Sequence, residues 1–539
     1  MPQSILASMW MPSADELAQL APLFALVGVI VTLLLGAMFT NRNRNVAASI
    51  VTIGAIATGM LAFRRLQSGA PSWAGFDPTG MGPMLISDTF SQFFIVLACV
   101  FMLIVTSMWW LGQKSDLPDS EVHRHDATEF FVLFVGSAFG MSLMVSTTNL
   151  LMIILAVEMA SLPSYGITAF RKKNRVAAEG ALKYVLFGAI TSAIMIYGAS
   201  LLYGYFGTLD LARIGEKIAA EWTGGATTST IFVSVALFAF MIGIAFKVSA
   251  VPFHFWCPDV FQGASIEVTT WLSVASKAAG LGLMLRVLSV ILCSPATFPV
   301  EALSYVSWTI AIMAAVTCTV GNLAAYRQMN LKRLLAYSSI AHAGYMLMAV
   351  AILWRPDDAG AGLAHPAFSA VVSYIVMYLL MNAGAFFVIA MVYWATGSES
   401  ITAMNGLIRR SPMLAICMAI ILFSLIGMPP LGGFYAKFYL LSAVWSAGLE
   451  WLVIVAVLNT LLSLYYYARI VRAMILTDDG LPEFAAPMSG QLVVAVCTLA
   501  ILLTGTFYAQ TLKNVGDNNA KGLYAVVKTD AAARTASAE

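Results

Sequence analysis

Charged residues are scarce in this sequence. Only 10% of its 539 residues are Asp, Glu, Lys or Arg, while 60% are hydrophobic and the mean hydropathy is +0.84. Water-soluble domains typically carry about 25% charged residues. The composition therefore excludes a water-soluble globular protein and predicts one whose solvent is the lipid bilayer. No segment combines basic and aromatic residues as nucleic-acid-binding segments do, so we expect no nucleic-acid partner.

Cysteine is also scarce, and its six positions are scattered. They stand singly in apolar surroundings, with no C-x-x-C motif and no histidine at metal-ligand spacing: Cys99, Cys257, Cys293, Cys318, Cys417 and Cys497. That pattern gives no support for a disulfide framework, a zinc site or an iron–sulfur cluster. No segment resembles a flavin or nucleotide site either, so we expect no cofactor in this chain.

Long apolar stretches make up most of the chain. About fourteen have the length of roughly 20 residues that crosses a hydrocarbon core, and the predicted fold class is an all-α polytopic membrane protein. The first stretch is long and lacks a small-residue cleavage site, so we expect a transmembrane helix there and not a removed signal peptide. The stretches lie near 17–40, 46–63, 89–112, 129–147, 149–170, 180–205, 229–251, 264–293, 302–325, 333–354, 367–396, 412–447, 450–472 and 487–510.

Basic residues in the connections predict the orientation, because positive charge stays on the side from which the chain is inserted. With the N-terminus outside, the inner connections hold fifteen of the 29 Lys and Arg residues, and the outer side with the C-terminal tail holds nine. Both termini are therefore predicted on the outer side. The other five lie within the apolar stretches: Lys183, Lys247, Lys277, Arg286 and Lys437.

A basic residue at the centre of a membrane helix costs about 2.5–3.5 kcal/mol and needs a partner, a water-filled path or a function. Arg286 lies on a long helix and could reach the interface along it. Lys183 follows Glu179 at the i,i+4 spacing that pairs charges on a helix. Lys247, Lys277 and Lys437 have apolar neighbours for a turn or more on both sides, which makes them the stronger candidates.

One acid lies in the middle of an apolar stretch, Glu158 within Leu151–Ser161. An isolated carboxylate there would protonate, so its expected partner is a buried lysine. Such a pair can hold both charges, and the proton affinity of the lysine falls when the glutamate moves away. The pair is either a proton switch or a fixed ion pair that joins two helices, and the sequence leaves both interpretations open.

Two segments place proline close to a lysine, Phe246–Pro258 and Gly427–Lys437. Unwound backbone at membrane depth survives only where protein or water satisfies it, and two such breaks in corresponding halves of a chain indicate a transporter with inverted repeats. His254 follows the first break and His342 lies among hydroxyl groups. Imidazole passes protons readily, although either histidine could serve packing alone.

These patterns divide the chain into five parts. We expect N-terminal transmembrane helices in 1–128, a first repeat of five helices in 129–293 and a second in 302–472. A C-terminal transmembrane helix follows in 473–510 and a polar tail in 511–539. Lys247 and Lys437 would each lie in the fourth helix of a repeat.

Five segments resemble the antiporter-like membrane subunits of respiratory complex I, and most closely the subunit N type. They are Val157–Tyr165, Ala181–Tyr184, Phe246–His254, Leu272–Gly280 and Leu331–His342, and the resemblance covers roughly residues 90–475. It implies a proton path formed by Glu158, Lys247, Lys277 and Lys437, with Lys183, His254 and His342 as connecting groups. The lysine at 437, where a related subunit is expected to carry glutamate, favours the N type, as does the lack of a long lateral C-terminal helix.

The segment Ala264–Glu267 departs from the family, which is expected to have a proline-rich segment there, and Glu267 adds an acid at a possible point of proton uptake. The resemblance further implies a bacterial inner membrane location, with other membrane subunits, lipids and protons as partners. NADH, FMN, iron–sulfur clusters and quinone would belong to partner subunits, so this chain would pump protons without oxidising a substrate.

Two other functions remain open at this point. A subunit of a multi-subunit cation/proton antiporter would share the same lysines. A structural subunit that only fills the membrane arm would tolerate neutralisation of Glu158.

Overall fold

The computed structural model describes residues 14–40, 42–68, 72–75, 82–113, 127–223, 227–292, 300–354, 364–477 and 486–519. The described chain is almost entirely helical, which confirms the predicted fold class. Its α-helices are α2 (Ala14–Gln19), α3 (Ala21–Phe39), α4 (Arg44–Ser68), α5 (Thr89–Gly112), α7 (Ala127–Met144), α8 (Leu150–Thr168), α9 (Arg175–Phe206), α10 (Leu211–Thr223), α11 (Thr227–Val248), α12 (Trp256–Gly263), α13 (Ile266–Leu292), α14 (Val300–Ala325), α15 (Leu331–Val350), α16 (Ala364–Thr396), α17 (Leu407–Arg410), α18 (Pro412–Ile426), α19 (Gly432–Ser446), α20 (Glu450–Leu476) and α21 (Met488–Thr506).

Twelve of the described helices are long and apolar enough to cross a membrane. Every predicted stretch coincides with helix, but two of them do not count among these twelve. Polar residues from Lys332 to Ser339 lower the hydropathy of α15, and the stretch 412–447 is divided into the shorter helices α18 and α19. The exact count of fourteen spans therefore stays a prediction.

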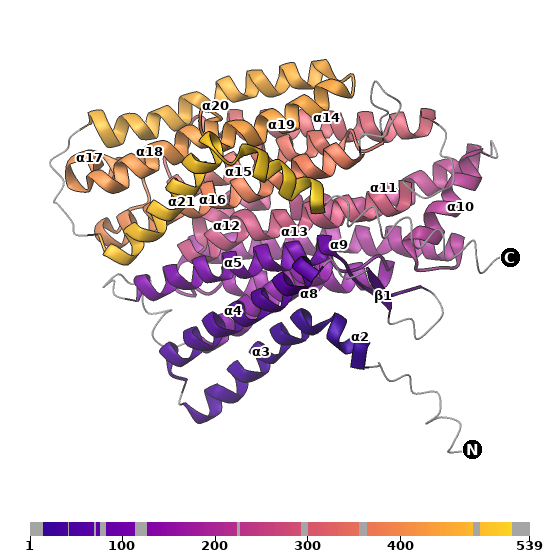
Figure 1. The fold of residues 1–539 in the computed structure, drawn as a ribbon, viewed down its shortest axis with the longest axis horizontal. Coiled ribbons are helices and arrows are strands. Elements are labelled where there is room, and N and C mark those ends of the chain that lie inside the picture. Colours follow the sequence, from indigo (N-terminus) through magenta and orange to yellow (C-terminus); the bar gives the residue numbers. More distant parts are fainter. Residues whose placement is uncertain are drawn as a thin grey trace.

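The helices lie side by side, from α3 and α4 at one edge of the bundle to α19 and α20 at the other (Figure 1). We call one end of the bundle the Lys332 end, where Lys332 donates a hydrogen bond to Ala264 O at 2.7 Å and pairs with Glu399 at 2.6 Å. We call the opposite end, where Arg286 binds Asp88, the Asp88 end. In Figure 1 the Lys332 end, with α17, is at the left, and the Asp88 end, with α10 and β1, is at the right.

A small hairpin covers part of the Asp88 end. Strands β1 (Trp73–Gly75) and β2 (Leu85–Ser87) pair antiparallel, with Ala74 opposite Ile86. The hairpin is fixed to the bundle because Ile86 N donates to Ser146 O at 2.8 Å. At the far end of the described chain, residues 511–519 of the predicted polar tail are helical, and Ser373 Oγ donates to Leu512 O at 3.1 Å. Residues 520–539 of that tail lie outside the described residues.

The same local structure occurs at both ends of the bundle. Asn149 caps the start of α8 and pairs as a β-bridge with Asp210, just beyond the end of α9. Asn330 caps the start of α15 and pairs in the same way with Ser400, just beyond the end of α16. The first bridge lies at the Asp88 end and the second at the Lys332 end. Corresponding elements therefore point in opposite directions.

The first proline-containing break interrupts α11 after Val248. Ser249 has a positive φ of 64°, and Pro252 has no N–H to continue the helical hydrogen bonds. The carbonyls and amides released by the break find protein partners, as membrane depth requires. Trp256 Nε1 donates to Phe246 O at 3.2 Å, and Val251 N donates to Thr317 Oγ1 at 3.0 Å.

The second break separates α18 from α19. Gly427 ends α18 with a φ of 91°, a conformation that a side chain would strain. Ser424 Oγ then accepts a hydrogen bond from Gly433 N at 3.0 Å. The last turn of α18 thus provides a partner for a free N–H group in the first turn of α19. Both predicted breaks are confirmed, whereas their position in the fourth helix of a repeat stays a prediction.

Arg286 does not reach the interface as one interpretation of the sequence allowed. Its guanidinium is fully buried and binds both oxygens of Asp88, at 2.9 and 2.8 Å. The same Asp88 accepts a hydrogen bond from Ser91 N at 2.8 Å and caps α5. The sequence analysis missed Asp88 because it stands at the end of an apolar stretch, where an acid is usually solvated.

We expect Arg286→Met to lower the stability of the protein by about 3–5 kcal/mol, because it leaves the Asp88 carboxylate buried without its partner. Thermal denaturation of the purified complex measures the effect. Adding Asp88→Asn should restore much of the loss, since asparagine still caps α5 and carries no charge. Arg213→Met, which removes a half-exposed partner of Asp210, is the control. Equal denaturation temperatures for Arg286→Met and this control would contradict the prediction.

Candidate functional site

Lys247 lies in the last turn of α11 and is 2% exposed. A cation at this position is stabilised by the partial negative charge at the C-terminal end of a helix. Its side chain passes the ring of Phe246, with Nζ 5.9 Å from the ring centroid. Gly280 of α13 packs on Lys247, where an added Cβ would lie 3.1 Å from Lys247 Cβ. The glycine thus lets α13 approach the broken helix closely.

Lys277 lies on α13, about one turn before Gly280, and is fully buried. Its Nζ donates to Cys257 Sγ at 3.8 Å and stands 5.1 Å from the ring centroid of Phe261. Both of these neighbours belong to α12. The first break therefore has a lysine on each side. Lys247 belongs to α11, before the break, and Lys277 contacts α12, after the break.

Lys437 lies on α19 and reaches back across the second break. Its Nζ donates to Leu425 O at 3.1 Å and Ile426 O at 3.0 Å, the carbonyls that end α18. It also lies 4.5 Å from the ring centroid of Tyr345. A cavity of about 450 Å³ between α19 and α20 borders Lys437, Phe434 and Thr460. The Lys437 side chain therefore lies between the end of α18 and this cavity.

Glu158 does not form the expected ion pair. One of its carboxylate oxygens is buried without a hydrogen-bond partner among the described residues. Its charge acts on Lys247, yet no described contact joins the two side chains. This structure therefore does not contain the fixed ion pair. The Glu158 carboxylate influences Lys247 without contacting it.

The two histidines have different surroundings. His342 on α15 is 2% exposed, and its Nδ1 lies 2.7 Å from Tyr374 Oη of α16. The charge of Lys437 acts at the position of His342. His254, in the segment that breaks α11, is 7% exposed and its Nδ1 has no described hydrogen-bond partner. The structure thus places His342 between the two breaks and His254 within the first.

Lys183 lies apart from the buried lysines. Its side chain is 37% exposed and binds Glu179 at 2.6 Å and Asp259 at 2.8 Å. Asp259 also binds Arg333 at 2.5 Å, so this group belongs to the Lys332 end. The predicted i,i+4 pair is present, but as part of a surface ion-pair cluster. No signal in the sequence indicated that Asp259, in the first turn of α12, would bind Lys183 and Arg333, or that Glu399, in the connection after α16, would bind Lys332.

The departure at Ala264–Glu267 lies in this same region. Lys332 Nζ and Arg171 Nη1 both donate to Ala264 O, at 2.7 and 3.5 Å. Glu267 is 2% exposed in the first turn of α13, where a negative charge favours the N-terminal end of a helix. Its predicted part in proton uptake stays a prediction.

A polar chain crosses the contact of α14 with α20, and the sequence analysis did not identify it. Tyr466 Oη donates to Asn322 Oδ1 at 2.9 Å, and Asn322 Nδ2 donates to Asn459 Oδ1 at 3.1 Å. Asn459 then donates to Thr319 Oγ1 at 3.0 Å. Two asparagines within apolar helices were a detectable signal.

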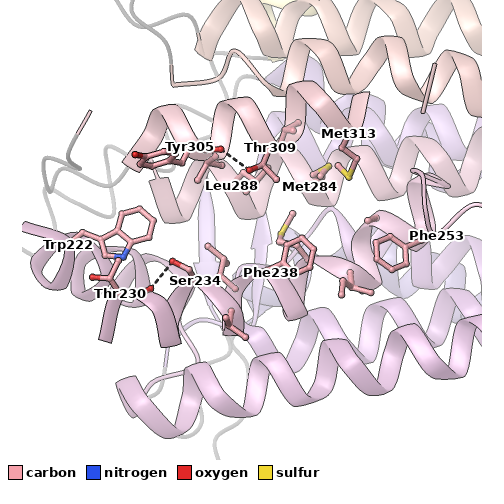
Figure 2. A pocket seen from close by; sticks show the side chains of 17 residues that line it. Trp222, Thr230, Ser234, Phe238, Phe253, Met284, Leu288, Tyr305, Thr309 and Met313 are labelled. Carbon is pink, nitrogen blue, oxygen red and sulfur yellow. Dashed lines mark hydrogen bonds between the residues drawn. The ribbon is translucent and has the colours of Figure 1, made fainter. Parts of the chain in front are cut away.

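A cavity of about 620 Å³ lies between α11, α13 and α14, and no charged side chain lines it. Figure 2 shows Phe238, Met284 and Met313 pointing into it, with Phe253 at one end and Trp222 at the other. Its hydroxyl groups are satisfied by their own helices, as in the bond from Ser234 Oγ to Thr230 O at 2.7 Å. This cavity is apolar and separate from the buried lysines.

These features define a class of protein. It is a polytopic membrane protein with two broken helices, each beside buried lysine side chains. Known proteins of this class share the fold. The chain aligns over 95% of its length with a chain of the Mrp complex from Dietzia sp. DQ12-45-1b, at a TM-score of 0.79 over 99% of that chain and 18% identity. That identity shows a common fold alone.

Closer relatives show the family. Residues 147–463 match the family described as NADH:quinone oxidoreductase/Mrp antiporter, TM. NADH-quinone oxidoreductase subunit N of Anaeromyxobacter sp. (strain Fw109-5) is 38% identical over 507 residues, covering 90% of this chain and 93% of the relative. A chain in the structure of respiratory complex I from Thermus thermophilus with bound Aureothin is 28% identical at a TM-score of 0.71, covering 91% and 98% of the two chains. The chain belongs to this family, and the relatives confirm the predicted subunit N type.

Proposed function

We propose that this chain is a proton-translocating subunit in the membrane arm of an NADH:quinone oxidoreductase. One observation carries the proposal. Lys247, Lys277 and Lys437 are buried at membrane depth, and none of them forms an ion pair with a described residue. A fixed structural role would favour paired charges, because an unpaired ammonium in low dielectric is costly. An ammonium that must exchange its proton needs weaker partners, which the thiol, carbonyls and aromatic rings here provide.

The energies involved fit such a function. Moving one charge against 100 mV costs about 2.3 kcal/mol. Each tenfold change in the proton affinity of a lysine corresponds to about 1.36 kcal/mol. A change of about a hundredfold, from movement of the Glu158 carboxylate or of a helix C-terminus, is therefore of the size that one pumping step requires.

The redox chemistry would take place in partner subunits that hold NADH, FMN, iron–sulfur clusters and quinone, and would reach this chain as an electrostatic or conformational change. Protons would be taken up near Lys247 and Lys277, pass His342 and leave from Lys437. Lys183 and His254 would be connecting groups of this proton path. Neighbouring antiporter-like subunits and lipids would surround the chain.

Topology forms part of the proposal. The two matching asparagine caps and β-bridges support five-helix repeats at 129–293 and 302–472, inverted relative to each other. The basic residues at the Lys332 end support placing that end on the inner side of a bacterial inner membrane. Both termini would then lie on the outer side.

A subunit of a cation/proton antiporter is the alternative, since the Mrp chain shares the fold. The 38% identity to a subunit N over nearly the full length of both chains favours the complex I assignment. Identification of the subunits that copurify with this chain separates the two: redox subunits support our proposal, and their absence supports the antiporter.

Replacing Lys247 with Met should abolish or strongly lower proton pumping coupled to NADH oxidation, because the first break loses its titratable group. Lys247→Arg should also impair pumping, since a guanidinium does not release its proton. Pumping is measured as acidification of sealed vesicles that contain the assembled complex. Lys173→Met, at an exposed position, is the control. Wild-type pumping by an assembled Lys247→Met complex would exclude the role.

Glu158→Gln should slow coupled turnover more than Glu158→Asp, because only the aspartate keeps a charge that can act on Lys247. NADH oxidation and pumping are compared at equal content of assembled complex. If the two variants perform equally well, Glu158 has no electrostatic function and the structural-subunit interpretation gains support.

Lys437→Ala should reduce the protons pumped per NADH even though Lys247 remains. Lys437→Arg separates two roles of this residue. Arginine can still donate to the carbonyls that end α18, but it cannot release a proton at neutral pH. We therefore expect both variants to pump poorly in sealed vesicles, while Lys513→Ala, at an exposed site, pumps normally. Full pumping by Lys437→Arg would show that Lys437 only caps the end of α18 and does not need to release a proton.

A further inference from the structure

The thiol of Cys257 occupies a junction between the first break and the second half of the chain. Cys257 is fully buried in the first turn of α12. Its Sγ accepts the hydrogen bond of Lys277 Nζ at 3.8 Å and lies 4.0 Å from Ser339 Oγ of α15. A thiol can donate one hydrogen bond and accept another, although both are weak. Cys257 is therefore the group that links a buried lysine to α15.

Two further hydroxyls interact with this thiol and form no hydrogen bond of regular length and angle with a described residue. Ser249 Oγ belongs to the backbone break two residues after Lys247, and Tyr378 Oη belongs to α16. Both side chains are at least nine-tenths buried. Buried polar groups without partners are rare in folded proteins. Their gathering around one thiol indicates a site where hydrogen bonds are exchanged.

The groups that continue from Ser339 lead toward His342. Ser339 and His342 stand three residues apart on α15, so their side chains lie on neighbouring positions of one helix face. The ring of Tyr378 is 5.1 Å from the ring of His342, centroid to centroid. His342 in turn interacts with the charge of Lys437. A proton that reaches Ser339 is thus near the imidazole of His342.

We propose that Cys257 is a relay residue of the proton path, which transfers protons from Lys277 to Ser339. This inference rests on the proposed function and adds a residue to that path. An N–H bond of the Lys277 ammonium breaks as an S–H bond forms, and the original thiol proton passes to Ser339 Oγ. The Ser339 proton passes to Tyr378 Oη, and the phenolic proton of Tyr378 passes to the imidazole of His342, whose ring lies 5.1 Å from that of Tyr378, centroid to centroid. The thiol and the two hydroxyls each gain one proton and lose one, Lys277 is left neutral, and His342 holds the transferred proton.

The transfer requires one local rotation. Ser339 Oγ now donates to Ala336 O at 2.8 Å within its own helix. The hydroxyl must turn away from that carbonyl before its proton can move toward Tyr378. Rotation of a hydroxyl is fast compared with helix movements, so this step would not limit turnover.

Variants of the assembled complex in sealed vesicles test the relay. Cys257→Ala should lower the protons pumped per NADH severalfold, because the methyl group neither accepts from Lys277 nor donates to Ser339. Cys257→Ser should restore most of the pumping, because its hydroxyl does both. Ser339→Ala, which removes the next group of the chain, should impair pumping as Cys257→Ala does. Cys99→Ala, at a buried cysteine with no described polar contact, should pump normally.

The outcomes are distinguishable. Full pumping by Cys257→Ala overturns the relay, and so does equally poor pumping by Cys257→Ser and Cys257→Ala, which would indicate packing alone. If Cys257→Ala does not assemble, Ser339→Ala decides the question, and its full pumping also overturns the relay. Lys247→Met serves as the reference: normal pumping by that variant contradicts the proposed function itself, whereas its loss together with normal Cys257→Ala contradicts only the relay.

Discussion

The structure depends on how an ammonium group is held in hydrocarbon. Both broken helices use the same solution, the partial negative charge at the C-terminal end of a half-helix. Lys247 stands in the last turn of α11, and Lys437 donates to the last carbonyls of α18. Interrupting a helix inside the membrane creates such an end where none would otherwise exist. The proline and glycine residues at the breaks are therefore what allows a lysine to be charged there.

Close helix contacts maintain this arrangement. Gly280 brings α13 onto Lys247, and Gly433 brings the start of α19 against Ser424 at the end of α18. Two other buried cations of the described chain are paired with carboxylates, Arg286 with Asp88 and Lys332 with Glu399. These two lie near the ends of the bundle, whereas Lys247, Lys277 and Lys437 lie between them with weaker partners.

The sequence predicted the helices and the burial of Lys247, Lys277 and Lys437 well, because both signals are local. Apolar length determines where a chain crosses a bilayer, and a lysine within such a stretch is conspicuous at any position. Partners distant in sequence were not predictable. Asp88 and Arg286 are 198 residues apart, and Cys257 and Ser339 are 82 apart. The exposure of Lys183 was missed for a related reason: its helix carries no pattern that distinguishes its outer face from its buried one.

The two breaks hold their lysines differently, and this difference has a mechanical consequence. Lys247 belongs to the helix whose end stabilises it, so lysine and helix end move together. Lys437 belongs to α19 but is bound by the end of α18. A small shift of α19 against α18 separates Lys437 from both carbonyls and opens or closes its contact with the neighbouring cavity. Movement at the second break therefore changes the proton affinity of its lysine directly. At the first break the same change requires a distant charge, such as Glu158, to move.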